Sequence, residues 1–235
     1  MINPKMVTVL VSISAVMIFA GSMMSNHNAE AIDTYEKTGF TLTHNPMICV
    51  TEPTPTTLFP ALNVELSRLS ENGIGDWYMA LNDSSQKNGW SIFHGTIPYD
   101  NTSTAKSFSC DITITFLPSP TFSPDQEEPV GLTTYDFAHH TAKIEIYYLA
   151  LKTQIHTKTV LNAYVYYWYT FTGYDQNNIA QEYQILQAIN HELGHAFGLG
   201  HHIAGDSPSV MTPLLNNADG LPTEADVQEL KSLYG

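Results

Sequence analysis

Two stretches of the chain carry apolar residues at helical spacing. Between 58 and 69 they lie three or four positions apart, and after a break at 72–75 the same spacing continues to 81. Residues three and four positions apart share one face of an α-helix, so this stretch predicts a helical region with one buried face. A second helix is predicted from about 179 to 197, behind cap residues at 175–178. The expected core positions are Leu58, Leu62, Leu66, Leu69, Ile74, Trp77, Tyr78 and Leu81 in the first stretch and Tyr183, Leu186, Ile189 and Leu193 in the second.

Other segments alternate apolar and polar residues with a period of two, which is the pattern of half-buried β-strands. The clearest are 90–97, 111–116 and 143–149. Residues 164–169 form an aromatic run that predicts a strand or hairpin packed on one face, with the wall of a substrate cleft as the alternative. The sequence therefore predicts both helices and a sheet.

The first 31 residues have the composition of an export signal. Lys5 supplies a positive charge, and 6–20 is a nearly unbroken apolar run, which has the length of a signal peptide and is short for a membrane span. Ala29 and Ala31 are the small residues of a cleavage site. The alternative is an uncleaved N-terminal anchor. In either case we expect most of the chain to lie outside the cytoplasm.

Length and composition allow one folded domain behind this leader. With 235 residues, 43% of them hydrophobic, the chain can bury one sizeable core. Residues 51–60 are rich in proline and threonine, which predicts a stiff connector. We therefore expect a signal peptide at 1–31, an N-terminal extension at 32–56 and the main domain at 57–235.

The charge balance excludes one class of function. Nine basic residues against 23 acidic ones give a net charge of −14, whereas nucleic-acid binding needs a positive contact surface. The acidic composition is typical of a soluble, surface-exposed protein. We expect a monomer in the extracellular space or at the cell surface. Contact with a membrane is expected only through an uncleaved N-terminal segment.

The strongest candidate for chemistry lies at the end of the second predicted helix. His191 and His195 are four residues apart, so both imidazoles can reach one ion from one helical face. Glu192 is placed to contact a water molecule beside that ion. Gly198 can adopt a positive φ, end the helix and turn the chain back, which brings His201 up as a third ligand. Three protein ligands and an open position describe a catalytic zinc site, whereas structural sites are usually closed by four.

Five fixed positions in this order arise by chance in such a chain only about once in 10⁴. They match the long zinc-binding consensus of the metzincin metalloproteases, and the chain resembles this clan at two further places. Ser209–Pro213 looks like the Met-turn that lies beneath the zinc, and 221–235 is similar to the closing helix of matrixin catalytic domains. The resemblance is sharp over about 181–235 and topological before that.

The resemblance implies an α+β fold of the metzincin type. A twisted, mostly parallel sheet with an antiparallel edge strand would pack on two long helices, the second of which carries the first two ligands. A small C-terminal part would hold His201, the Met-turn and the last helix. Residues 131–136 resemble the edge strand, which would bind an extended peptide by β-augmentation. Met211 would bind no metal and would pack beneath the histidines.

The function that the resemblance implies is a secreted zinc-dependent endopeptidase acting on a protein or peptide. One Zn²⁺ would activate water, and Glu192 would take the proton from that water and pass it to the leaving amine. The alternative is a catalytically silent metzincin-like zinc-binding module at the cell surface. Cleavage of an unstructured protein in the presence of metal distinguishes the two.

The chain has candidates for further metal sites. His139 and His140, near Asp136, are candidates for a second, structural zinc of the matrixin kind, with ordinary surface histidines as the alternative. Calcium is a family-level expectation, although the chain has no contiguous Ca²⁺-loop motif. His202 should point away from His201.

Cys49 and Cys110 are the only two cysteines. An even number in an oxidising compartment favours a disulfide. The alternative is that Cys49 binds the zinc as a thiolate and keeps the enzyme latent. The residues around Cys49 lack the sequence of such a switch, and this arrangement would leave Cys110 unpaired.

Overall fold

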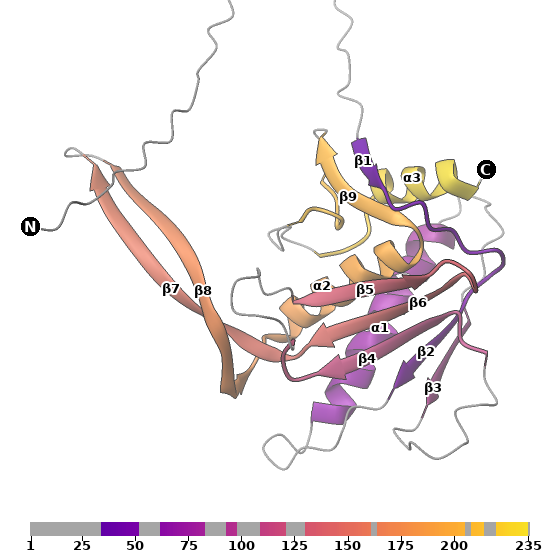
Figure 1. Ribbon diagram of the computed structural model, residues 1–235, viewed down its shortest axis with the longest axis horizontal. Helices are drawn as coiled ribbons and strands as arrows, with labels where there is room; N and C mark the ends of the chain where they lie inside the picture. Colours follow the sequence, from indigo (N-terminus) through magenta and orange to yellow (C-terminus); the bar gives the residue numbers. More distant parts are fainter. Residues whose placement is uncertain are drawn as a thin grey trace, which may run out of the picture. The chain divides into compact units, whose positions relative to one another are not determined.

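The computed structural model describes residues 34–51, 62–82, 93–97, 109–120, 130–160, 164–204, 208–213 and 220–234. The predicted leader at 1–31 and Leu58 lie outside these ranges. The domain boundaries after 31 and after 56 also lie outside them and stay predictions. The fold is α+β, as expected (Figure 1). Its elements are β1 (Thr34–Lys37), β2 (Met47–Thr51), α1 (Leu62–Asn82), β3 (Phe93–Ile97), β4 (Ile112–Leu117), β5 (Gly131–Asp136), β6 (Thr141–Tyr147), β7 (Leu149–Val160), β8 (Tyr164–Ile179), α2 (Glu182–Ala196), β9 (Leu199–Ala204) and α3 (Glu224–Tyr234).

The main sheet has five strands in the order β3-β2-β4-β6-β5 (Figure 1). Four strands, β2, β3, β4 and β6, run parallel to one another. The fifth, β5, pairs antiparallel with β6. This confirms the expected parallel sheet with an antiparallel edge strand at 131–136. Side chains of the sheet, α1 and α2 meet in one core, in which Ile114 and Ile144 face each other across β4 and β6 and are fully buried.

Two smaller sheets accompany the main one. β7 and β8 form a long antiparallel hairpin, so the aromatic run at 164–169 is a strand, as predicted. β1 pairs antiparallel with β9, a pairing that the sequence analysis did not anticipate. Of the part of the chain that the structure describes, no helix is both long and apolar enough to cross a membrane.

Helix α1 is continuous, and the break expected at 72–75 is wrong. The glycine that suggested it permits close packing of α1 against α2. A Cβ on Gly73 would lie 2.6 Å from Cγ2 of Ile189, so a side chain there would force the helices apart. Gly73 weakens the helix only slightly, and packing against Ile189 outweighs that cost.

Two expected core residues are exposed. Tyr78 on α1 is 44% accessible and Tyr183 on α2 is 61% accessible. α2 begins at Glu182, so Tyr183 lies in its first turn. The neighbouring positions agree with the prediction: Trp77, Ile189 and Leu193 are fully buried.

Cys49 and Cys110 form a disulfide, as expected, with their Cα atoms 5.8 Å apart. Cys49 lies on β2, and Cys110 lies two residues before β4, the parallel neighbour of β2. The two cysteines are separated by 61 residues, and closing a loop of that length stabilises the folded chain by about 4 kcal/mol in the chain-entropy model. Since these are the only cysteines, neither thiol can serve as a metal ligand.

Candidate metal centre

Helix α2 presents two of the candidate ligands and is fixed against α1 immediately before them. The indole N–H of Trp77 donates to the carbonyl of Asn190, 2.9 Å away. The side-chain amide of Asn190 donates to the carboxylate of Asp76 at 3.0 Å and to the carbonyl of Gly220 at 2.9 Å. These bonds leave little freedom for the turn that carries His191.

Gly198 ends the helical turn and reverses the chain, as expected. Its φ is +105°, a conformation that side chains disfavour. A Cβ there would also lie 2.6 Å from the carbonyl oxygen of Phe40. The hydroxyl of Thr38 donates to the Gly198 carbonyl at 2.8 Å. The chain then enters β9, which carries His201 back toward α2.

His191, His195 and His201 converge. One ring nitrogen of each lies within 4.8 Å of the corresponding nitrogens of the other two, and no second group of this kind occurs in the described ranges. Their ring centroids are separated by 4.7, 4.9 and 5.4 Å. The structure thus brings together the three histidines that the motif singles out.

Nδ1 of His191 and of His195 is hydrogen-bonded to a backbone carbonyl, and Nδ1 of His201 lies near a carboxylate. Such an acceptor places the ring proton on Nδ1 and leaves the lone pair of Nε2 for a metal. This is the usual arrangement of metal-binding histidines. The pairs are His191 Nδ1 with the Val210 carbonyl at 2.8 Å, His195 Nδ1 with the Leu199 carbonyl at 2.8 Å, and His201 Nδ1 with the Glu36 carboxylate at 3.4 Å.

Burial keeps two of these imidazoles neutral. It lowers the pKa of His191 to about 4 and the pKa of His195 to about 3. Both rings are therefore unprotonated at neutral pH, which is the form that binds metals. Three imidazole ligands with no anionic ligand fit Zn²⁺, with a fourth position left for water or substrate.

The Glu192 carboxylate is buried against edge strand β5. The hydroxyl of Thr133 donates to Oε2 of Glu192 at 2.6 Å and also contacts the Glu192 carbonyl at 3.1 Å. A Cβ on Gly131 would lie 2.6 Å from Cγ of Glu192. Burial raises the pKa of Glu192 to about 7, although the bond from Thr133 opposes that rise. A carboxylate that titrates near neutral pH suits a general base.

Met211 packs beneath the helix that carries the ligands. Its side chain is fully buried, and its sulfur occupies the space where Gly194 would carry a Cβ. The backbone N–H of Met211 donates to the Ser209 hydroxyl at 2.9 Å. The carbonyl of Met211 accepts from the N–H of His202, also at 2.9 Å, which ties the turn to β9.

Asp226 on α3 holds this turn in place, a role that the sequence analysis missed. Its fully buried carboxylate accepts hydrogen bonds from four residues. One donor is the N–H of Val210, whose carbonyl binds the first ligand histidine. Asp226 and Thr223 form a capping pair at the start of α3, a signal readable in the sequence. The donors are the Tyr35 hydroxyl at 2.9 Å, the Ser209 hydroxyl, the Val210 N–H at 3.1 Å, and the N–H and hydroxyl of Thr223, both at 2.9 Å.

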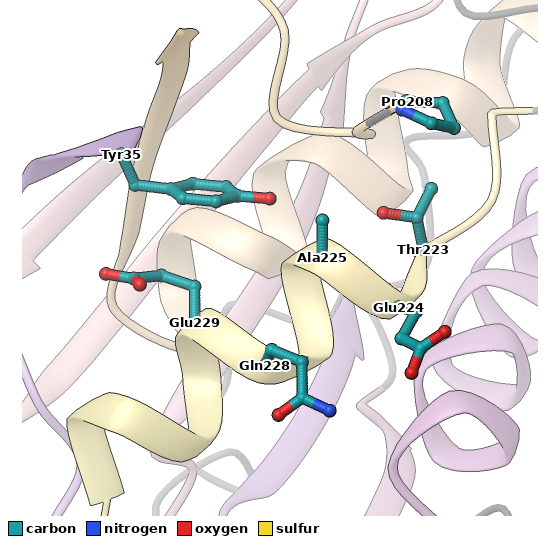
Figure 2. A pocket seen from close by; sticks show the side chains of 7 residues that line it. All are labelled: Tyr35, Pro208, Thr223, Glu224, Ala225, Gln228 and Glu229. Atoms are coloured by element: carbon teal, nitrogen blue, oxygen red, sulfur yellow. The ribbon is translucent and has the colours of Figure 1, made fainter. Parts of the chain in front are cut away.

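A pocket of about 470 Å³ lies beside this network, and none of the three candidate ligands lines it. Figure 2 shows the Tyr35 ring reaching across toward α3, with Pro208 on the far side. The two acidic residues that line the pocket, Glu224 and Glu229, do not point toward a common position. The lining residues are Tyr35, Pro208, Thr223, Glu224, Ala225, Gln228 and Glu229.

The other histidines whose side chains the structure describes lie outside the cluster. His202 packs its ring 5.0 Å from that of Tyr35 and is not a member, as expected. Nδ1 of His139 pairs with Asp136 at 2.7 Å, while Nδ1 of His140 donates to the Thr41 carbonyl at 2.8 Å. The two side chains therefore engage different partners. A second zinc or a calcium ion stays a prediction.

Comparison with known families agrees with this geometry. The model of the matrixin family matches residues 102–235, more than half of the chain, including the complete histidine motif and the Met-turn. A search of curated proteins finds no match.

Proposed function

The chain belongs to the matrixin family of zinc metalloproteases, and from that premise we propose that it is a secreted zinc-dependent endopeptidase. The three clustered histidines would hold one catalytic zinc, and Glu192 would be the general base. The observation that carries the proposal is the convergence of the three rings, each with Nδ1 at an acceptor.

The zinc ion and the protein residues would contribute different parts of the reaction. Zinc, when bound, supplies Lewis acidity that lowers the pKa of water and polarises the peptide carbonyl. Glu192 accepts the proton of the attacking water and passes it to the leaving amine. Oε2 of Glu192 accepts the hydrogen bond from the Thr133 hydroxyl, which leaves Oε1 to take the proton. Thr133 therefore orients the base toward the edge of the sheet.

The substrate would bind as an additional strand along β5. β5 is the last strand of the main sheet, so its backbone groups face outward on the side opposite β6. An extended peptide can pair with such an edge through main-chain hydrogen bonds. Because Thr133 lies on β5 and contacts Glu192, a peptide on this edge would pass beside the base.

Export is supported by three features of the chain. Disulfides persist in oxidising compartments, and Cys49 and Cys110 are joined. The apolar run at 6–20 has the length of a signal peptide, and the net charge of −14 suits a soluble extracellular protein. We propose an extracellular or surface-exposed monomer that acts on proteins or peptides.

Removing the metal tests the proposal. We expect the purified full-length protein to cleave casein or gelatin, to lose this activity with a zinc chelator, and to regain it when zinc is returned. His195→Ala should abolish the cleavage. His44→Ala, which removes an exposed histidine outside the cluster, should leave it unchanged.

Two outcomes would contradict the proposal. Cleavage that survives complete removal of zinc would exclude a metal-dependent mechanism. Stoichiometric zinc without cleavage of any unstructured protein would instead indicate the catalytically silent zinc-binding module.

A further inference from the structure

Strand β1 lies against the third candidate ligand through an irregular pairing with β9. One residue of β1, Glu36, is opposite two residues of β9, Gly200 and His201, so β9 is bulged at the ligand. Bulges beside functional sites often redirect a side chain. The regular pairs on either side are Tyr35 with His202 and Lys37 with Leu199.

The fit between β1 and the bulge is close at the backbone. A Cβ on Gly200 would overlap the carbonyl oxygen of Glu36, so only glycine allows the two strands to approach this closely. Side-chain hydrogen bonds also hold the segment at 35–38 on both sides of this contact. The Tyr35 hydroxyl donates to Asp226 at 2.9 Å, and the Thr38 hydroxyl donates to the Gly198 carbonyl at 2.8 Å.

The Glu36 carboxylate lies where the other two ligands have a backbone carbonyl. Its Oε2 is 3.4 Å from Nδ1 of His201. A carboxylate at this nitrogen holds the proton on Nδ1, turns Nε2 toward the metal and makes the imidazole a stronger donor. Partners of this kind typically change metal affinity by about 10–100-fold. The Glu36 side chain is 56% accessible, so we expect the lower end of that range.

We propose that Glu36 is a positioning residue for His201, and that strand β1 is a permanent part of the metal centre. This inference rests on the proposed zinc site. It gives residues 34–37, which precede the region matched by the family model, an indirect role in metal binding through His201. A leader cut after Ala31 would leave the segment intact, whereas a cut after Lys37 would remove the carboxylate.

Zinc affinity of the full chain tests this inference without using activity. We expect Glu36→Ala to bind zinc about tenfold more weakly than wild type in competition with a chromophoric chelator. Glu36→Gln keeps an acceptor oxygen and should recover part of the loss. Glu229→Ala is the matched control, because it removes a carboxylate from the pocket beside β1, which none of the three candidate ligands lines, and should bind zinc as wild type does.

The tautomer of His201 gives a second readout that depends on neither zinc nor catalysis. In the zinc-free protein at mildly alkaline pH, ¹⁵N chemical shifts should show the proton on Nδ1 in wild type and a shift toward Nε2 in Glu36→Ala. Unchanged affinity together with an unchanged tautomer would overturn the role of Glu36. If wild type bound no zinc, the proposed function would fail, and the tautomer would still decide whether Glu36 orients His201.

Discussion

Replacing Glu192 with glutamine should leave zinc bound and lower peptide cleavage by about 10²–10⁴-fold, the usual contribution of a general base. Glutamine keeps the size of the side chain and can still accept the hydrogen bond from Thr133, but it cannot take a proton from water. The measurement is kcat/KM on a fluorogenic peptide, with zinc content determined on the same sample.

Glu182→Gln is the matched control for this substitution. Glu182 lies in the first turn of the same helix, and its side chain is 67% accessible. It contacts Arg68 at the surface, so its loss should not change kcat/KM. Full activity in Glu192→Gln would refute the assigned base, and loss of zinc in that variant would show that Glu192 supports the metal rather than the water.

Replacing Asp226 with alanine should destabilise the protein by about 4 kcal/mol. The change leaves the buried N–H of Val210 and the part-buried N–H of Thr223 without their acceptor, and each such loss costs about 1–3 kcal/mol. The carbonyl of Val210 fixes the ring of His191, so zinc affinity should fall by about tenfold or more. Urea denaturation and zinc competition on the same preparation measure both effects.

Glu224→Ala provides the comparison for Asp226. Glu224 is an exposed acid in the same first turn of α3, and its removal should change stability by less than about 0.5 kcal/mol, as is usual for such surface positions. If Asp226→Ala unfolded at the same urea concentration as Glu224→Ala, the hydrogen bonds to Asp226 would not stabilise the turn at 209–211.

The parts of the site that follow from local spacing were predictable. Histidines four apart share a helical face whatever surrounds them, and Gly198 is the residue that a left-handed turn favours. The edge strand was found through its resemblance to a known family. Since these signals extend over a few residues each, no knowledge of the tertiary packing was needed.

The parts that depend on distant contacts were not predictable. Glu36 and Asp226 lie about 165 and 25 residues away from His201 in the sequence, and they reach the centre through a strand pairing and a buried carboxylate. Gly73 looked like a helix break because its close approach to α2 is invisible in the sequence. Tyr183 satisfied the helical pattern, but its side chain lies on the exposed side of the first turn of α2.

The measurement that tests the central claim most directly is X-ray absorption at the zinc edge of the zinc-loaded, full-length protein. The account predicts one zinc with three imidazole nitrogens at about 2.0–2.1 Å and a further light atom from water. It also predicts no sulfur at about 2.3 Å, because both cysteines are in the disulfide. A spectrum with a sulfur ligand, or with fewer than three imidazoles, would contradict the assignment of His191, His195 and His201.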